Sequence, residues 1–274
     1  MKILSIGWTI CSTAALMVDG RILACVSEER FSRIKNDDSY PFQSVEAVLK
    51  EGGVKPDELD LIVIAGEMFD AKAFLCHKYS RFSVQDRLRE QYEYWYPRLC
   101  QGRDISYIEV FKDKVDTSQY PGEWSGVIDF LKHGDKNNAD SFFQEFLRHT
   151  VAKHLGVDPQ KIIFTHHHLS HAYYAYYASQ IKRDRVVILV AEAWGDDKNA
   201  SVNLAEGGSI RMLSSSTNFI IGRLYRHMTL LLGMKPDEHE YKVMGLAAYS
   251  KPKYYKEPLA IFKNTMYVDD LGFA

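Results

Sequence analysis

The sequence is poor in several features that mark whole classes of protein. Its four cysteines stand in no C-x-x-C pair and at no regular spacing, so free thiols in a reducing compartment are expected. Residues 1–16 contain a lysine and only a broken apolar run, which excludes a signal peptide and a spanning helix there. The 34 basic and 36 acidic residues are scattered and form no basic stripe. We therefore expect a cytoplasmic protein that has no membrane partner and does not bind nucleic acid.

The chain opens with a pattern typical of short strands. At 274 residues, 46% of them hydrophobic, it is long enough for one large domain or two modest ones. Strands are predicted over 2–6, 14–18 and 21–27, with a small polar stretch over 7–13. The Asp19-Gly20 pair between two apolar runs is a strong hairpin signal.

The same layout recurs later in the chain. Strands are predicted over 186–191, 201–205 and 209–213, with a polar connection over 192–200 and a turn at Gly207-Gly208. This repeat indicates a duplicated α/β chain whose polar turns face a shared cleft. Coincidence is the alternative, because hairpins are frequent.

Residues 68–140 are aromatic, charged and irregular in pattern, apart from an amphipathic helix predicted over 85–99. We interpret them as an insertion into the core fold, either part of a substrate-binding lid or a purely structural elaboration. A helix is predicted over 141–155, with Gly156 just past its end.

A histidine cluster, with sequence His-His-His-Leu-Ser-His over 166–171, carries the clearest chemical signal. On a helix, His167 and His171 are four residues apart and share one face, so their imidazoles can bind one metal ion. A surface histidine run or core histidines satisfied by hydrogen bonds are the alternatives, since coordination needs a third ligand.

The two polar turns together form a candidate phosphate-binding site. Small residues let backbone N–H groups and hydroxyls approach phosphate oxygens closely. Asp196 or Asp197 could position a metal or a water molecule there. The candidate ligand-binding residues of the turns are Gly7, Ser12, Thr13, Gly195 and Ser201.

A last candidate lies in the helix predicted over 241–249. Lys242 with Gly245 at its start could meet a phosphate at the helix N-terminus. An ordinary helix with an exposed lysine is the alternative.

Three motifs together resemble one family. They are Val-Ser-Glu-Glu-Arg-Phe-Ser-Arg at 26–33 with Lys35, His-His-x-x-His-Ala at 167–172, and Lys-Val-Met-Gly-Leu-Ala at 242–247. Their order and spacing resemble the O-carbamoyltransferases of antibiotic and nodulation-factor biosynthesis, over 3–249 apart from 68–140. The resemblance implies a duplicated actin/hexokinase-like (ribonuclease H-like) α/β fold. The first half would occupy 1–180 and an incomplete second half 181–274.

The resemblance also implies a reaction and a set of site residues. A carbamoyl group would pass from carbamoyl phosphate, through a carbamoyl-adenylate made from ATP, to the hydroxyl of a small-molecule acceptor. His167 and His171 would bind an iron-type divalent metal, with Glu192 completing part of the ligand set. The catalytic residues implied in this way are Lys35, His168 and Asp196.

The sequence departs from the family pattern at several points. Relatives carry His-Asp where this chain has Ile10-Cys11, Asp where it has Glu192, and Gly where it has Tyr241. Relatives also continue into a domain that activates carbamoyl phosphate, so such a domain or a partner chain is expected here. The alternatives are a threonylcarbamoyl transferase-like or kinase-like enzyme of the same fold, or a metal- or nucleotide-binding subunit without activity.

Overall fold

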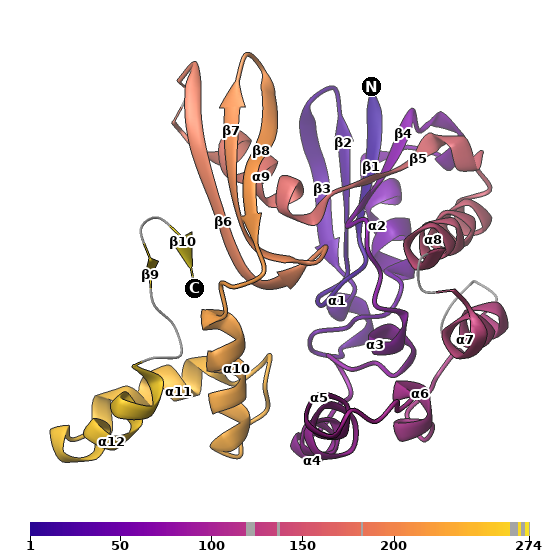
Figure 1. Cartoon of the computed structure of the whole chain (residues 1–274). Helices are drawn as coiled ribbons and strands as arrows, with labels where there is room; N and C mark the ends of the chain where they lie inside the picture. The colour runs from indigo at the N-terminus through magenta and orange to yellow at the C-terminus, as the bar shows by residue number, and fades with distance from the viewer. Residues whose placement is uncertain (119–123, 136–137, 182, 264–267, 270–271, 274) are drawn as a thin grey trace. The chain divides into compact units, whose positions relative to one another are not determined.

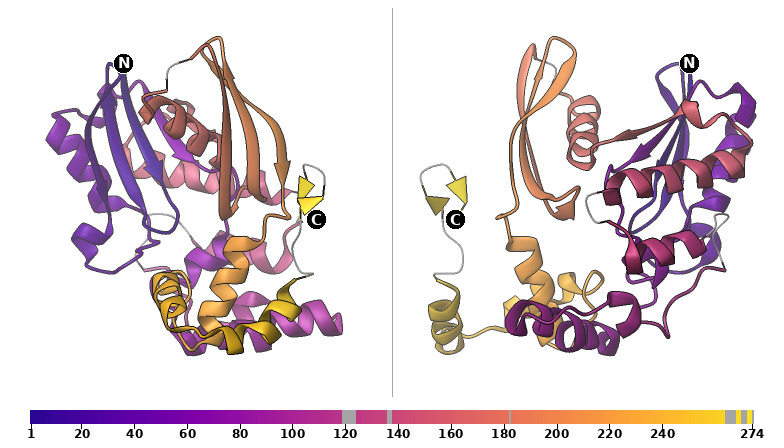
Figure 2. Two further views of the ribbon diagram at one scale, coloured as in Figure 1. Left: turned by 90° about the vertical axis from the view of Figure 1, so that its left-hand side faces the viewer. Right: turned by 45° about the vertical axis from the view of Figure 1, so that its right-hand side comes forward.

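The computed structural model forms two compact units (Figures 1 and 2). The first unit comprises 1–82 and 89–167, and the second comprises 83–88 and 168–274. Within them, the structure describes 1–118, 124–135, 138–181, 183–263, 268–269 and 272–273.

The first unit contains a five-stranded sheet with the order β3-β2-β1-β4-β5. Strands β1, β2 and β3 pair antiparallel, whereas β4 pairs parallel to both β1 and β5. Side chains alternate along a strand, so Leu4 and Ile6 of β1 face the core and Ser5 faces away. The strands are β1 (Lys2–Gly7), β2 (Thr13–Val18), β3 (Arg21–Ser27), β4 (Leu61–Ala65) and β5 (Ile162–Thr165).

Helices supply the rest of the first core. Val45, Val48 and Leu49 of one helix join the same buried cluster as Leu147 and Val151 of another. The helices are α1 (Glu29–Ser32), α2 (Phe42–Gly52), α3 (Ala71–Leu75), α5 (Tyr96–Gln101), α6 (Tyr107–Val110), α7 (Trp124–His133) and α8 (Ala139–Leu155), and α4 (Val84–Arg89) crosses from the second unit.

The helix predicted over 85–99 is confirmed, and the described part of 68–140 holds more helix than its irregular pattern indicates. This part holds α3 to α7 and a π-helical segment, Glu90–Trp95. Trp8, which follows β1, is buried, and its ring lies 5.3 Å from Phe69 and 6.5 Å from Trp124, measured between ring centroids. Aromatic packing against the core, which no short-range periodicity reveals, therefore holds this region in place.

The second unit contains an antiparallel sheet with the order β6-β7-β8. Helix α9 (His167–Ala178) lies against it, with Ala172 packed among Ile188, Val190 and Ala205 (Figure 1). The strands are β6 (Arg185–Gly195), β7 (Lys198–Glu206) and β8 (Ser209–Ser216). The remaining elements are α10 (Ile221–Leu231), α11 (Glu240–Leu246), α12 (Pro252–Phe262), β9 (Val268–Asp269) and β10 (Gly272–Phe273).

The predicted repeat of three antiparallel strands is confirmed, and with it the α/β fold class. Both units turn between their second and third strands through two residues of positive φ, Asp19-Gly20 and Gly207-Gly208. Such turns match the right-handed twist of the strands they join. In both units the pairing of these two strands also shifts register once.

Two boundaries differ from the prediction. Pairing of β6 with β7 reaches Gly195 and Lys198, so the polar connection predicted over 192–200 shrinks to Asp196-Asp197. The units meet within the first turn of α9, after His167, rather than at residue 180. Helix α9 groups with the second sheet because its apolar side chains pack on that sheet.

Across the described residues, no helix combines the length and the apolar character needed to cross a lipid bilayer.

Candidate metal centre

Three side chains with metal-binding chemistry converge at the start of α9. One ligand atom from each of His167, His171 and Glu192 lies within 4.8 Å of the others. The two histidines are held by a single helix, and Glu192 and His171 belong to the same unit. The grouping therefore depends on α9 and β6 alone. We call these three residues the metal trio.

The donor set of the metal trio suits a transition metal. Two imidazoles with one carboxylate are the ligands of many non-haem iron(II) sites, and they leave coordination positions open. His171 Nε2 lies 3.4 Å from Glu192 Oε2, and the His171 side chain is half exposed. The residues present therefore fit an iron-type ion.

His168 points into the second unit and is not one of the metal trio, although it lies next to Glu192. It is fully buried, and its Nδ1 lies 3.1 Å from Ser201 Oγ. Its Nε2 faces Glu192 Oε1 at 2.9 Å. His168, which is predicted to be catalytic, thus contacts a hydroxyl and a carboxylate of its own unit. Its direct action on a substrate stays a prediction.

The second polar turn is a tight hairpin. Asp196 and Asp197 both have positive φ, which Asp tolerates better than most residues, and Gly195 pairs with Lys198. Asp196 is largely buried, and the Ser201 hydroxyl is in hydrogen-bond contact with His168 Nδ1. Binding of a phosphate or cofactor by Gly195, Asp196 and Ser201 stays a prediction.

The first polar turn is held by its own hydrogen bonds. Ser12 Oγ donates to the Thr9 carbonyl at 2.9 Å, and its N–H donates to the Asp37 carbonyl at 2.8 Å. Thr13 Oγ1 donates to the Cys11 carbonyl, and the Cβ that a side chain would add at Gly7 meets only the Thr13 carbonyl within 4 Å. Both polar groups of Ser12 are engaged, so its role toward a phosphate stays a prediction.

A small pocket of about 340 Å³ lies beside the first turn and is lined by Glu29, Arg33 and Lys35. Arg33 has φ +61°, which ends α1 and starts the segment that carries Lys35. Two cationic side chains and one carboxylate around an open pocket can bind an anion or a polar carbonyl compound. Lys35 is thus placed where its predicted role is chemically possible.

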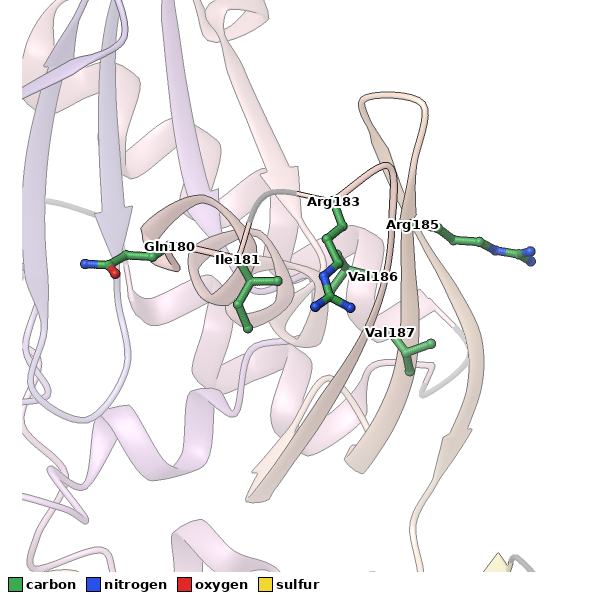
Figure 3. A pocket seen from close by; sticks show the side chains of 6 residues that line it. All are labelled: Gln180, Ile181, Arg183, Arg185, Val186 and Val187. Atoms are coloured by element: carbon green, nitrogen blue, oxygen red, sulfur yellow. The ribbon is translucent and has the colours of Figure 1, made fainter.

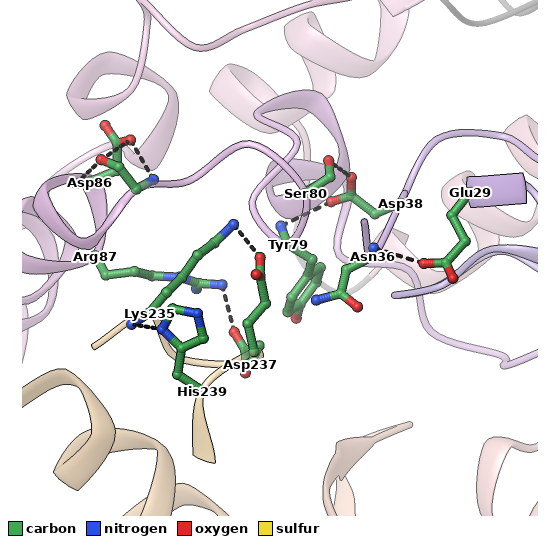
Figure 4. A network of polar contacts seen from close by, with 12 residues as sticks. Glu29, Asn36, Asp38, Tyr79, Ser80, Asp86, Arg87, Lys235, Asp237 and His239 are labelled. Atoms are coloured by element: carbon green, nitrogen blue, oxygen red, sulfur yellow. Dashed lines mark hydrogen bonds and ion pairs between the residues drawn. The ribbon is translucent and has the colours of Figure 1, made fainter. Parts of the chain in front are cut away.

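Other residues of the 26–33 motif have structural roles that sequence reasoning missed. The buried Glu28 carboxylate accepts the N–H groups of Gln43 at 3.1 Å and Ser44 at 2.8 Å, at the start of α2. In the same unit, Asp38 accepts from Tyr79 N and Ser80 Oγ (Figure 4). These carboxylates tie the motif segment to its neighbours.

The third motif follows a charged connection in the second unit. Asp237 has φ +67° and pairs with Arg87 Nη2 at 2.6 Å (Figure 4). It also pairs with Arg226 Nε at 3.0 Å. Lys242 is exposed near the start of α11, as predicted. Gly245 is the sixth of the seven residues of α11, not at its start, so the expected backbone approach at the helix N-terminus does not involve it.

A second hollow, of about 530 Å³, lies on the second unit. It is lined by Gln180, Ile181, Arg183, Arg185, Val186 and Val187 (Figure 3). Gln180 and Arg185 point away from one another, and Arg185 pairs with Glu206 at 3.4 Å. Because its polar groups do not converge, we assign it no ligand.

Comparison with known proteins connects this geometry to a family. A family model described as the carbamoyltransferase N-terminus matches residues 2–268. The chain belongs to the carbamoyltransferase N-terminus family. The resemblance inferred from the three motifs is therefore confirmed.

Relatives of this chain among known proteins are much longer than it is. The nodulation protein NolNO of Sinorhizobium fredii is 26% identical over 247 residues, which are 89% of this chain and 28% of that protein. The uncharacterized protein sll1178 of Synechocystis is 29% identical over 248 residues, which are 89% of this chain and 34% of that protein. The chain thus spans about a third of the length of such relatives. The solved structure of YeaZ from Pseudomonas aeruginosa matches 79% of this chain and 68% of its own at 12% identity and a TM-score of 0.30.

Asn203 is the residue of this centre that the sequence analysis overlooked. It is buried in β7, and its Nδ2 donates to Ser201 Oγ at 2.9 Å. Ser201 and Asn203 are two residues apart and so lie on the same face of β7, which is a usable signal for a polar network under a helix.

Proposed function

We propose that this chain is the metal-binding N-terminal portion of an O-carbamoyltransferase. In this proposal the carbamoyl group of carbamoyl phosphate is carried through a carbamoyl-adenylate, formed with ATP, to the hydroxyl of a small-molecule acceptor. Membership of the carbamoyltransferase N-terminus family supports the reaction class. The observation that carries the proposal is the metal trio, His167, His171 and Glu192, at the second of the three family motifs.

The metal trio defines what the second unit contributes. A divalent ion bound there would act as a Lewis acid toward a phosphate oxygen. His167 and His171 offer neutral imidazole nitrogens from one helix face, and Glu192 offers an anionic oxygen. The half-exposed His171 leaves this group open to a ligand.

The pocket of Glu29, Arg33 and Lys35 defines what the first unit contributes. The Lys35 ammonium and the Arg33 guanidinium can hold a phosphate or the carbamoyl oxygen by charge-assisted hydrogen bonds. Such contacts orient the carbamoyl group before transfer and stabilise the charge that develops on its oxygen.

The greater length of the relatives supports an additional part in the active enzyme. In our proposal, activation of carbamoyl phosphate takes place on a C-terminal domain or a partner chain, in the cytoplasm. The chain described here would bind the metal and present the carbamoyl group to the acceptor.

The experiment compares His171→Ala with the exposed His149→Ala on α8. The assembled enzyme, supplied with ferrous iron, ATP and ¹³C-carbamoyl phosphate, is assayed for a carbamoylated hydroxyl product. His171→Ala should abolish transfer and keep the circular dichroism spectrum of the wild type, and His149→Ala should behave as wild type. Unchanged transfer by His171→Ala would refute the metal assignment.

One observation favours a second candidate function, a metal- or nucleotide-binding subunit without transfer activity. Burial, followed by the nearby Glu29 carboxylate, raises the pKa of the Cys11 thiol, which stands in the turn where relatives carry His-Asp. A thiol held protonated is a poor general base at neutral pH. Metal binding by the assembled protein without any carbamoyl transfer would favour this function.

A further inference from the structure

Lys35 stands at a boundary between exposed and buried chain in the first unit. Its own side chain is exposed, whereas the five residues that follow it, 36–40, are all buried. Four of these five are polar, with the sequence Asn-Asp-Asp-Ser over 36–39. Buried polar groups need hydrogen-bond partners, so a loop that buries four such residues in a row is held by specific contacts. We call residues 36–40 the support loop.

The first contacts of the support loop come from the pocket itself and from the turn after β1. The Asn36 N–H donates to Glu29 Oε2 at 3.1 Å, and Glu29 also lines the pocket (Figure 4). The Asp37 carbonyl accepts the Ser12 N–H at 2.8 Å. Asp37 Oδ1 accepts the N–H and the hydroxyl of Ser39, at 2.9 and 2.6 Å. The start of the loop is therefore fixed by hydrogen bonds to the backbone.

The backbone on both sides of Lys35 is left-handed. Arg33 has φ +61° and Asn36 has φ +56°. Such a conformation is uncommon for residues other than glycine, and it persists only where the surrounding structure determines it. The direction in which the Lys35 side chain leaves the backbone therefore depends on the contacts of the support loop.

Asp38 joins the support loop to the 68–140 insertion. It is fully buried, and its Oδ2 accepts the Tyr79 N–H at 3.1 Å while its Oδ1 accepts the Ser80 hydroxyl (Figure 4). His77 Nδ1 lies 3.5 Å from the same Oδ1. All of these residues belong to the first unit. Both oxygens of one buried carboxylate thus connect the insertion to the segment that carries Lys35.

We propose that Asp38 is a positioning residue for Lys35, and that residues 77–80 of the insertion complete the Lys35 site by holding Asp38. This inference rests on the proposed binding of a phosphate or a carbamoyl oxygen by Lys35 and Arg33. Asp38 acts through the support loop and does not contact the ligand. The insertion, which the sequence left open as a lid or a purely structural elaboration, thereby gains a role in the site.

The first test measures the binding of carbamoyl phosphate to the 274-residue chain by isothermal titration calorimetry. Lys35→Ala should lose most of the binding, which shows that the probe reports on this pocket. Asp38→Asn should weaken binding about 10-fold, because the new amide can accept from only one of the two donors that Asp38 engages. Ser80→Ala should weaken binding less, and should have little further effect in the Asp38→Asn chain.

Asp70→Asn is the matched control. Asp70 lies in the same insertion and also accepts a backbone N–H, that of Ala73, at the start of α3. Its replacement should lower stability and leave the binding of carbamoyl phosphate unchanged. Hydrogen exchange in peptides over 33–40 should become faster in Asp38→Asn and stay that of the wild type in Asp70→Asn. A general loss of stability would not produce this difference.

Two results would overturn the positioning role. One is wild-type affinity or wild-type exchange in Asp38→Asn, and the other is an equal loss of binding in Asp38→Asn and Asp70→Asn. Circular dichroism checks that each variant is folded. Ser80→Ala carries the same test if Asp38→Asn does not fold, and wild-type affinity in Ser80→Ala would then overturn the role.

Failure of the proposed function gives different results. Absence of binding by the wild-type chain, or wild-type binding by Lys35→Ala, would overturn the role of Lys35 and with it that of Asp38. Co²⁺ alone, titrated and followed by its visible absorption, reports separately on the metal trio and should bind Asp38→Asn as it binds the wild type. A chain that binds carbamoyl phosphate but no Co²⁺ would overturn the metal site and leave the positioning role standing.

Discussion

Two histidines of this protein share one arrangement, a buried imidazole between a hydroxyl and a glutamate. In the first unit, His154 Nδ1 lies 2.9 Å from the Tyr40 hydroxyl and Nε2 lies 2.9 Å from Glu46 Oε1. In the second, His168 has Ser201 and Glu192 in the same roles. His154 joins α8 to the start of α2 and stacks on Phe42, so its role is structural. The two sites differ in the glutamate: Glu192 belongs to the metal trio, whereas Glu46 does not.

His154 leads to a prediction about pH. Burial is the largest influence and lowers the pKa of His154 below its ordinary value, against the opposing effect of Glu46. Protonation therefore favours the unfolded chain, and stability that is present above about pH 6.5 is lost as the pH falls through the folded pKa. Urea unfolding between pH 8 and 5 should show this loss in the wild type, at no more than about 1.4 kcal/mol per pH unit. His154→Gln should lack this component, and an identical pH profile for both proteins would contradict it.

Glu28 leads to a prediction about a motif residue. Since its carboxylate accepts two backbone N–H groups at the start of α2, Glu28→Gln should lower the free energy of unfolding by about 1–2 kcal/mol. Chemical denaturation measures this loss, with Glu51→Gln on the exposed side of α2 as the matched control. The Co²⁺ affinity should stay that of the wild type. A stable Glu28→Gln variant with impaired carbamoyl transfer would instead place Glu28 in the chemistry.

Among the elements, the turn after β1 has a larger structural role than its polar sequence indicates. Trp8 is 2% exposed and lies edge-on to Tyr40 at 4.9 Å and to Phe69 at 5.3 Å between ring centroids. It thereby joins the first sheet to the helical region that begins near residue 69. The turn thus places Trp8 in the core. It also contacts the segment next to Lys35 through the Ser12 N–H, which donates to the Asp37 carbonyl.

Trp8→Ala should lower the free energy of unfolding by about 3–5 kcal/mol, because a large buried ring is removed from a packed site. Trp95→Ala is the matched control, since Trp95 is 37% exposed and should cost clearly less. Equilibrium urea denaturation measures both. Equal losses for the two variants would show that Trp8 does not anchor the region.

The elements also show which predictions local signals support. The hairpin turns at Asp19-Gly20 and Gly207-Gly208, strand Leu61–Ala65 and the αL residue Gly156 after α8 were all predictable, because turn chemistry and apolar runs act over a few residues. The extension of β6 to Gly195 was not, because pairing with β7 overrides the polar character of that stretch.

For the whole molecule, the division into two units gives the proposed metal a defined location. His171 and Glu192 belong to the second unit, and His167, the first residue of α9, is the last residue before that unit resumes. Binding to the folded state alone stabilises that state by mass action. The gain should therefore be local to the second unit.

Co²⁺ at about 100 times its dissociation constant should add about 2.7 kcal/mol to the stability of the second unit. Hydrogen exchange followed by mass spectrometry should show slower exchange in peptides from β6 and β7 than without metal. Peptides from β1 and β4 serve as the internal control and should change little. Slower exchange confined to the first unit would contradict the location of the site.

The sequence by itself indicated the strand–hairpin repeat, the family and the shared helix face of His167 and His171, because each is recognised from short local segments of the chain. Only the tertiary structure decided which groups Glu192, His168 and Ser201 contact. They come from a helix and two strands, and their contacts exist only once α9 packs on the β6–β7–β8 sheet. Within 68–140, the helix over 85–99 could be predicted from its pattern, whereas the packing of Phe69 against Trp8 and the first core was seen only in the tertiary structure.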